Sequence, residues 1–249
     1  MILTSDQVAD YDQDGYLLVP DLFAPPEVAA MLREVEGGER VAAHVRDAAD
    51  ATGKAAKLAL WGDIGPDIWG AATTAPRLVN AIQTLMRDQA VFFHGKVMLK
   101  VAHSGGAWEW HQDYGYWYGN GYVYPRLMSA FVALDPATRE NGCLQVLRGS
   151  HKMGRLTHGQ IAGQTGADMS RIHQLEPLFE RVHCEMSPGS VLFFDCNLLH
   201  ASAANESDHD RRAFIVCYNA LSNPQLTPDG VADQKPCPIG TADAIQQFS

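Results

Sequence analysis

The sequence has no long hydrophobic run, no excess of basic residues and no CxxC motif. A transmembrane helix needs about 18 or more consecutive apolar residues, so we expect no membrane span. Segment 1–11 has neither a basic region nor an apolar core, which argues against a secretory signal. The net charge of −10 disfavours nucleic-acid backbones and anionic membranes as partners.

The five cysteines are odd in number and lie mostly in apolar runs, a pattern that does not suit a disulfide framework. We therefore expect reduced, mainly buried thiols and a cytoplasmic protein. A zinc site formed by Cys184, Cys196 and neighbouring residues is the alternative for these thiols.

The first third of the chain favours helices. Three segments combine a capping residue or an opening proline with an apolar face, at about 5–11, 25–36 and 76–87. Residues 16–19 form a short apolar run that predicts a strand. Residues 41–70 are rich in Ala and Gly and fit neither pattern clearly.

From Val91 onward the chain shows short β-branched and aromatic runs separated by Gly, Pro and Asn. These predicted strands are 91–101, 126–134, 143–147, 182–186, 191–194 and 213–218. Several strands without alternating helices predict a mainly β sandwich or jelly roll, with the N-terminal helices buttressing one sheet. We expect one domain over residues 1–249, with a core at about 11–220 and an irregular tail at 221–249.

A candidate metal site begins with His111 and Asp113, which lie two residues apart in a predicted extended segment. Residues i and i+2 of such a segment point to the same face, so both can reach one ion. An isolated His-x-Asp pair also occurs without any metal, so the third ligand matters. His200 would complete two imidazoles and one carboxylate, the facial triad of non-haem iron(II) oxygenases. Asp195 is a competing carboxylate, but its spacing from His200 places it on the opposite strand face.

Two arginines, Arg211 and Arg212, follow the last candidate ligand on the next predicted strand. A guanidinium can bind a carboxylate through two parallel hydrogen bonds. Ser202, two residues after His200, can point to the same side and donate a further hydrogen bond. One arginine and Ser202 can thus bind the far carboxylate of 2-oxoglutarate, while the other arginine is solvated at the strand start.

These elements together resemble the phytanoyl-CoA dioxygenase family. The resemblance runs from about residue 11 to residue 219. It is carried by W-H-x-D at 110–113, G-S-H at 149–151, F-F-D-x-N-x-x-H-x-S at 193–202 and the arginine at 211. It implies a double-stranded β-helix of the cupin-like jelly-roll type that uses Fe(II), 2-oxoglutarate and dioxygen.

The resemblance also implies roles for particular residues. His111, Asp113 and His200 would be the catalytic iron ligands, and Ser202 and Arg211 would bind 2-oxoglutarate. Halogenating relatives lack the carboxylate ligand, so Asp113 indicates a hydroxylase.

Aromatic residues are dense after the His-x-Asp motif and form either packing or a substrate wall. Within the family, the chain resembles the ectoine hydroxylase branch, where Trp117 and Phe194 match aromatics that hold a small zwitterion. Glu109 and Ala213 differ from that branch, so we expect a related small polar metabolite. The candidate substrate contacts are Trp117, Phe194, Tyr114, Glu109 and His94.

His94, Lys96, Met98 and Lys100 alternate along the predicted strand before the motif and therefore share one face. If this face lies outside, both lysines are solvated. If it lies inside, either lysine can bind the cosubstrate or an anionic group of the substrate. We take Lys96 as a further candidate contact of 2-oxoglutarate.

The predicted function is hydroxylation of a C–H bond in a small amino acid, aminophosphonate or natural-product intermediate, with 2-oxoglutarate converted to succinate and CO2. Desaturation or ring closure are open alternatives for the outcome. A non-enzymatic metal-binding jelly-roll protein and a cupin-type hydrolase or isomerase are the rival classes, and neither needs Arg211. We expect a monomer or homodimer that binds neither nucleic acid nor membrane.

Overall fold

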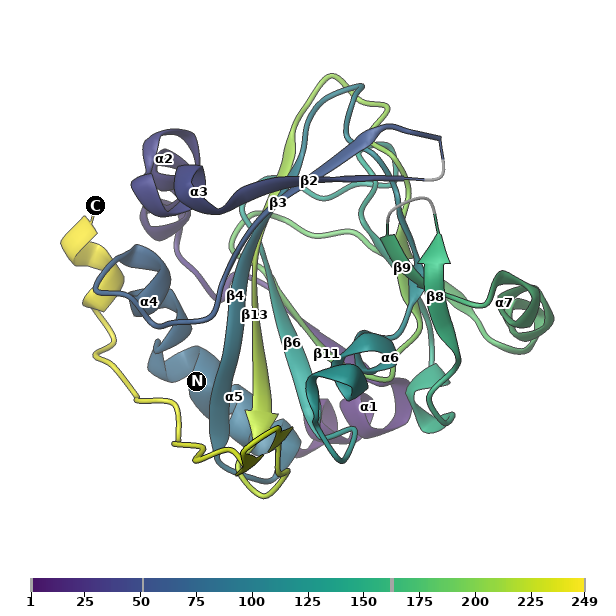
Figure 1. Cartoon of the computed structure of the whole chain (residues 1–249). Helices are drawn as coiled ribbons and strands as arrows, with labels where there is room; N and C mark the ends of the chain where they lie inside the picture. The colour runs from purple at the N-terminus through teal and green to yellow at the C-terminus, as the bar shows by residue number, and fades with distance from the viewer. Residues whose placement is uncertain (1, 51, 162–163, 249) are drawn as a thin grey trace.

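Two antiparallel sheets face each other, and helices cover the outer side of the larger one (Figure 1). The computed structural model describes residues 2–50, 52–161 and 164–248. In spatial order the large sheet contains β1 (Tyr16–Val19), β11 (Val191–Asp195), β6 (Leu127–Ala133), β13 (Arg211–Ala220), β4 (Ala90–Lys100), β3 (Ala55–Trp61) and β2 (Val45–Ala49). The small sheet contains β10 (Arg181–Cys184), β7 (Leu144–Leu147), β12 (His200–Ser202) and β5 (Trp108–His111). The predicted mainly β jelly roll is confirmed.

Strand alternation gives the large sheet two different faces. Lys96 and Met98 of β4 line a cavity between the sheets, and Lys100 reaches across to β12. Val97, between them, is fully buried in the apolar layer on the outer side. This period of two is the pattern expected for a strand whose two faces meet different surroundings.

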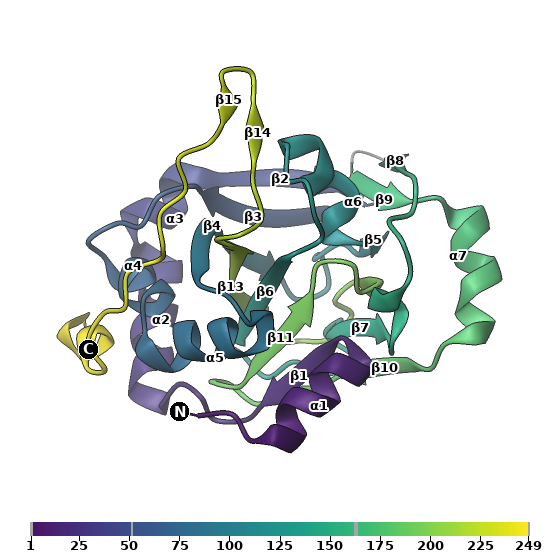
Figure 2. The same cartoon turned by 90° about the horizontal axis from the view of Figure 1, so that it is seen from below.

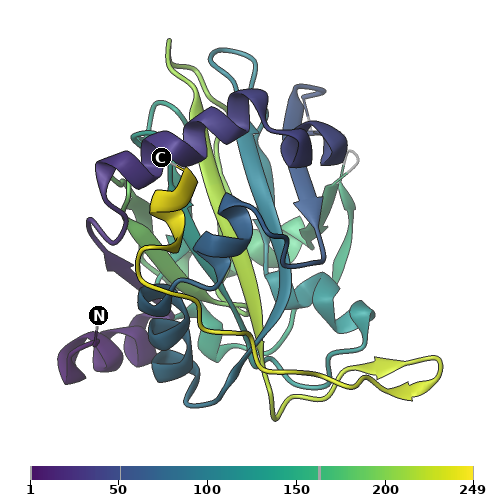
Figure 3. The same cartoon turned by 90° about the vertical axis from the view of Figure 1, so that its left-hand side faces the viewer.

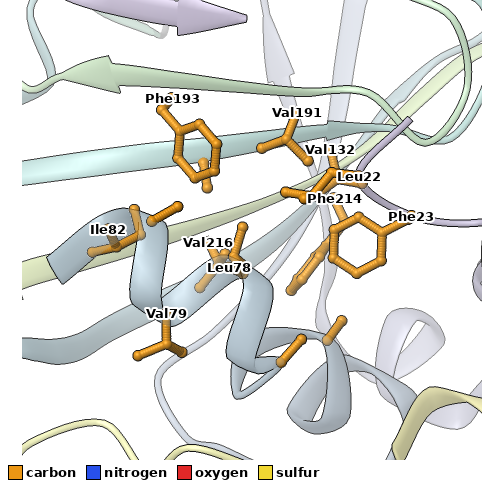
Figure 4. Close-up of a cluster of buried hydrophobic side chains, with 14 of the residues drawn as sticks. Leu22, Phe23, Leu78, Val79, Ile82, Val132, Val191, Phe193, Phe214 and Val216 are labelled. Atoms are coloured by element: carbon orange, nitrogen blue, oxygen red, sulfur yellow. The ribbon is translucent and has the colours of Figure 1, made fainter. Parts of the chain in front are cut away.

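The outer apolar layer holds the helices against the large sheet (Figures 1 and 3). These helices are α1 (Ser5–Asp14), α2 (Pro25–Gly37), α3 (Glu39–His44), α4 (Ile68–Thr73) and α5 (Pro76–Met86). Prolines begin α2 and α5, where a missing N–H leaves no hydrogen bond unmade. Figure 4 shows side chains of α5 and of three strands in one cluster, among them Leu78, Val79, Ile82, Val132, Phe193, Phe214 and Val216.

The ambiguous region 41–70 contains α3, α4 and the β2–β3 hairpin, which extends the large sheet. The hairpin turn is fixed by Asp50, whose buried carboxylate accepts hydrogen bonds from the backbone N–H groups of Thr52, Lys54 and Ala107. The contact with Ala107 joins segments that are distant in sequence, so periodicity in the sequence could not reveal it.

Other segments also differ from the prediction. The hairpin of β8 (His158–Ile161) and β9 (Gln164–Ala167) and helix α7 (Met169–Leu175) were not predicted. The tail was predicted to be irregular, which is wrong for β14 (Leu226–Thr227), β15 (Gly230–Val231) and the 3-10 helix η4 (Ala244–Phe248). The β14–β15 hairpin projects from the molecule (Figures 2 and 3), and η4 contacts α2 and α4. None of the helices in the described parts of the chain has the length and apolar character to span a membrane.

Replacing Leu78 by Ala should lower the free energy of unfolding by about 2–5 kcal/mol, because this fully buried side chain joins α5 to the sheet. Urea denaturation of the variant and the wild type measures the difference. Asn80→Ala, on the exposed side of the same helix, is the matched control and should shift it by less than about 0.5 kcal/mol. Equal effects of both substitutions would contradict this view of the core.

Candidate metal centre and cosubstrate pocket

A cavity of about 680 Å³ lies between the two sheets. Inward side chains of β3, β4 and β13 form one wall, and side chains of β5 and β12 form the other. Its volume falls within the range of roughly 300–1,000 Å³ that is typical of small-molecule sites. Eight of the eleven predicted site residues line this cavity, and Asp113, Tyr114 and Glu109 do not.

The three candidate metal ligands come together at its wall, where His111 and His200 line the cavity and Asp113 is buried beside them. His111 ends β5 and His200 begins β12, and the two residues are direct partners in the strand pairing. The Asp113 Oδ1 atom lies 3.7 Å from His111 Nε2 and 3.8 Å from His200 Nε2. All three side chains are buried, and their ligand atoms lie close enough together to hold one ion.

Hydrogen bonds to the backbone orient both imidazoles. His111 Nδ1 donates to the carbonyl oxygen of Glu109 at 2.6 Å, and His200 Nδ1 donates to that of Leu198 at 2.9 Å. Each Nε2 lone pair is therefore directed into the site, as metal ligation requires. Burial lowers the pKa of His111 to about 3 and also lowers that of His200. Both rings are thus neutral at physiological pH, the form that binds metals.

The Asp113 carboxylate is held by two hydroxyl groups. Tyr116 donates to Oδ1 at 2.6 Å, and Ser129 donates to Oδ2 at 2.9 Å. Burial alone would raise the pKa of Asp113, but Lys96, both histidines and the Tyr116 hydrogen bond together lower it. The carboxylate is therefore ionised and oriented before any ligand arrives.

The residue between the ligands anchors the motif. The Gln112 backbone N–H donates to His158 Nε2 at 2.9 Å, and its side chain donates to the carbonyl oxygen of Asn197, just before His200. Gln112 thus ties the two halves of the triad together. Nothing in the sequence pattern singled out Gln112, Tyr116 or Ser129 for these contacts, because the partners of Gln112 and Ser129 lie on distant segments and the partner of Tyr116 depends on a helix that was not predicted.

Arg211 and Arg212 have different surroundings. Arg212 pairs with Asp135 and Glu36 away from the cavity. Arg211 lines the cavity and is 2% exposed, and its Nε and Nη1 atoms have no hydrogen-bond partner among the described residues. Burial lowers the pKa of Arg211 to about 10, so it stays charged at neutral pH. An unpaired buried guanidinium is costly, and a ligand carboxylate would satisfy it.

Both lysines of β4 face inward, so the solvent-exposed alternative is wrong. Lys96 lines the cavity, and Lys100 donates a hydrogen bond to Ser202 Oγ at 2.8 Å. Ser202 also lines the cavity, and Lys100, which donates to it, is the strand-pairing partner of Arg211. A carboxylate placed between Arg211 and Ser202 would meet three buried donors, which fits a dicarboxylate cosubstrate.

Three of the five candidate substrate contacts line the cavity: Trp117, Phe194 and His94. The other two do not, and both corrections have a structural reason. Helix α6 (Asp113–Trp117) begins at the last residue of the motif, so the period changes from 2 to 3.6. Tyr116 and Trp117 therefore face the cavity, whereas the Tyr114 hydroxyl donates to the carbonyls of residues 122 and 123.

A register shift displaces the fifth candidate, Glu109. His111 pairs with His200, and Trp108 pairs with Ser202. The chain thus advances three residues along β5 but only two along β12, so β5 contains one extra residue at this point. This bulge turns Trp108 into the cavity in place of Glu109. A second shift lies between Cys217 and Tyr218, opposite β4, where Phe93 lines the cavity beside His94.

The competing metal ligands are not supported. Asp195 lines a different, smaller cavity, and burial raises the pKa of its carboxyl to about 7. Within the described part of the chain, the only cluster of His, Cys, Asp and Glu suited to a metal is His111, Asp113 and His200. The zinc alternative with Cys184 and Cys196 therefore fails.

A jelly roll that presents two histidines and one carboxylate beside a buried, unpaired arginine defines the class of non-haem iron oxygenases that use a 2-oxo acid. Residues 11–213 match the phytanoyl-CoA dioxygenase family, so the chain belongs to this family. It is an Fe(II)- and 2-oxoglutarate-dependent dioxygenase.

Individual relatives agree with this placement. The ectoine dioxygenase of Bordetella bronchiseptica is 28% identical over 267 residues, covering 98% of this chain and 84% of the relative. The L-proline trans-4-hydroxylase of Streptomyces griseoviridis is 27% identical over 240 residues, covering 90% and 89%. The structure of EctD from S. alaskensis with 2-oxoglutarate and 5-hydroxyectoine matches with a TM-score of 0.75 and 25% identity, over 94% of this chain and 82% of that one.

Removing the Tyr116 hydroxyl in Tyr116→Phe should weaken Fe(II) binding by about 10- to 100-fold, because Asp113 loses a hydrogen bond that orients it. Anaerobic titration with Fe(II) gives the dissociation constant. Tyr114→Phe removes a hydroxyl from the same helix that contacts only backbone carbonyls, and it should bind Fe(II) like the wild type. Unchanged affinity in Tyr116→Phe would show that Asp113 needs no such support.

Proposed function

We propose that this enzyme hydroxylates a small amino-acid-like or zwitterionic metabolite that carries an anionic group. The single observation that carries the proposal is the convergence of the His111, Asp113 and His200 cluster with the unpaired Arg211 in one cavity. A metal site alone would suit many functions, whereas a buried receptor for a carboxylate beside it suits a 2-oxo acid cosubstrate.

In this proposal His111, Asp113 and His200 hold the iron. When bound, iron supplies the activation of dioxygen and the oxidation of 2-oxoglutarate to succinate and CO2. The neutral Nε2 atoms and the ionised Asp113 carboxylate form the donor set that Fe(II) prefers. The carbonyl groups of residues 109 and 198 keep both rings in the ligating tautomer.

Arg211 and Ser202 bind the far carboxylate of 2-oxoglutarate and orient its other end toward the metal ligands. The face of the Phe131 ring lies 5.5 Å from the Arg211 guanidinium, which helps to keep the charge buried and the side chain fixed. Because Arg211 is already placed and unpaired, cosubstrate binding needs little rearrangement of this wall.

The substrate binds nearer to the metal, beside Trp117, Phe194 and His94. These side chains exclude water and hold the reacting carbon in one orientation. We assign Lys96 to an anionic group of the substrate. Among the groups that lower the pKa of Asp113, Lys96 has the largest effect, so its charge lies near the metal ligands. The sequence suggested that Lys96 contacts 2-oxoglutarate instead. In that case the Lys96→Met substitution would raise the dissociation constant of the cosubstrate.

The names of the relatives support this substrate class. Two curated relatives are an ectoine dioxygenase and an L-proline trans-4-hydroxylase, and proline is an amino acid with a carboxylate. The cavity of about 680 Å³ has room for such a molecule beside the cosubstrate. A cytoplasmic location, a monomeric or homodimeric state and the absence of nucleic-acid and membrane partners stay predictions from the sequence.

Turnover gives the direct test of function. The anaerobically purified, iron-loaded protein should form succinate from 2-oxoglutarate and air when offered one class from a panel of amino acids, cyclic zwitterions, aminophosphonates and apolar acids. We expect stimulation by zwitterions with a carboxylate, and its loss in Asp113→Ala, which lacks a ligand. Iron binding without succinate from any compound would favour a non-enzymatic metal-binding protein or a cupin-type hydrolase.

The two neighbouring arginines allow a matched test of the cosubstrate site. Arg211→Met should weaken 2-oxoglutarate binding by at least about 100-fold, because a bidentate, desolvated ion pair is lost. Arg212→Met removes an equal charge that contacts Asp135 and Glu36 instead, so the affinity should stay the same. Anaerobic calorimetric titrations measure both. Similar losses in both variants would mean that Arg211 does not contact the cosubstrate.

A further inference from the structure

Lys100 and Arg211 are adjacent buried basic residues, of which Arg211 lines the cavity and Lys100 lies behind it. They are direct partners in the pairing of β4 with β13 and are 3% and 2% exposed. Neither forms an ion pair with a carboxylate among residues 2–50, 52–161 and 164–248. Two like charges in a desolvated place disfavour each other, so one of them tends to lose its proton. Lysine is the one that can do so, because a guanidinium stays protonated.

The groups around the Lys100 amine do not supply the missing negative charge. They are Arg211 on β13, the Cys143 thiol just before β7 and the Asp50 carboxylate in the β2–β3 turn. Burial raises the pKa of Cys143 to about 11, so this thiol is neutral. The Asp50 carboxylate accepts hydrogen bonds from three backbone N–H groups and forms no ion pair with Lys100 among the described residues. Burial, and then Arg211, lower the pKa of Lys100 to about 6, which makes the free amine the main form at neutral pH.

The hydrogen bonds of Lys100 prepare the cosubstrate site in either charge state. Its Nζ donates to Ser202 Oγ and to the carbonyl oxygen of Ala203. These two bonds use both hydrogens of a neutral amine, and the third hydrogen exists only in the ammonium form. Because Ser202 Oγ accepts from Lys100, its own hydrogen points elsewhere and is available to a ligand in the cavity.

We propose that Lys100 is a positioning residue for the cosubstrate, and that it takes up one proton from solvent when the far carboxylate of 2-oxoglutarate binds beside Arg211 and Ser202. The inference rests on the proposed function, since it requires that this carboxylate binds there. A carboxylate beside the amine stabilises its ammonium form and provides an acceptor for the third hydrogen.

A defined pH dependence follows. Below the pKa of Lys100 in the free protein, the amine is already charged, and above its pKa in the complex it is neutral in both states. Between these limits binding takes up a proton, so 2-oxoglutarate affinity rises as the pH falls, by at most about tenfold per pH unit.

The experiment is calorimetric titration of the Fe(II)-loaded protein with 2-oxoglutarate under anaerobic conditions at about pH 7.5, in phosphate and in Tris. The two buffers have different ionisation enthalpies, so the difference in heat gives the number of protons taken up. The wild type should take up close to one proton per 2-oxoglutarate.

Three variants separate Lys100 from other titrating groups. Lys100→Met should take up fewer protons and bind 2-oxoglutarate about 10- to 100-fold more weakly. Lys100→Arg carries a permanent charge, so it should also lose the uptake but keep most of the affinity, without the wild-type pH dependence. Lys96→Met, which removes a lysine of the same strand on the metal side, is the matched control and should keep the uptake.

Two results would overturn the proposal. One is 2-oxoglutarate binding to the wild type without proton uptake, and the other is equal uptake by the wild type and Lys100→Met. Unchanged Fe(II) affinity in both Lys100 variants shows that they are folded. If the wild type with bound iron fails to bind 2-oxoglutarate, the proposed function fails, and this inference fails with it.

Discussion

The pairing of β5 with β12 is the constraint on which the site depends. It places His111 directly opposite His200, on two strands that are nearly ninety residues apart in the chain. A bulge in this pairing turns Trp108 into the cavity. Helix α6 begins two residues after the end of β5 and brings Asp113 next to the two imidazoles. Without this register the two imidazoles would face different sides of the small sheet, and no ion could contact both.

The second constraint is electrostatic. The protein as a whole is acidic, yet its cavity is lined or backed by Lys96, Lys100 and Arg211, and the buried carboxylates near them are Asp113 and Asp50. Arg211 is a buried cation without a partner, which destabilises a folded protein, so its presence needs an explanation beyond stability. Anionic ligands that complete the charge balance provide one. The overall charge therefore describes the surface, whereas the chemistry of the site depends on a few desolvated groups.

Much of this could be predicted from the sequence, but only where the information is local. Strands such as β4, β6 and β13 follow from their apolar runs, and His111, Asp113 and His200 follow from motif spacing. The β2–β3 and β8–β9 hairpins lack such runs and are stabilised by contacts with distant segments. The same limit explains the two substrate candidates that were wrong. Tyr114 was proposed from the density of aromatic residues and Glu109 from the resemblance to the ectoine hydroxylase branch, and neither signal shows the bulge and the helix that direct the two side chains away from the cavity.

The change from strand to helix at the metal ligands also explains how one short segment serves three purposes. His111 belongs to the sheet, so its position is fixed by strand pairing. Asp113 belongs to α6, so its carboxylate is oriented by Tyr116 one turn later, and the next residue, Trp117, lines the cavity. In a continuous strand, residues 113, 115 and 117 would share this face. Gly115 would then replace Tyr116 beside Asp113, and the phenol that orients the carboxylate would point to the opposite face. The local change of period thus couples metal binding to the shape of the substrate pocket.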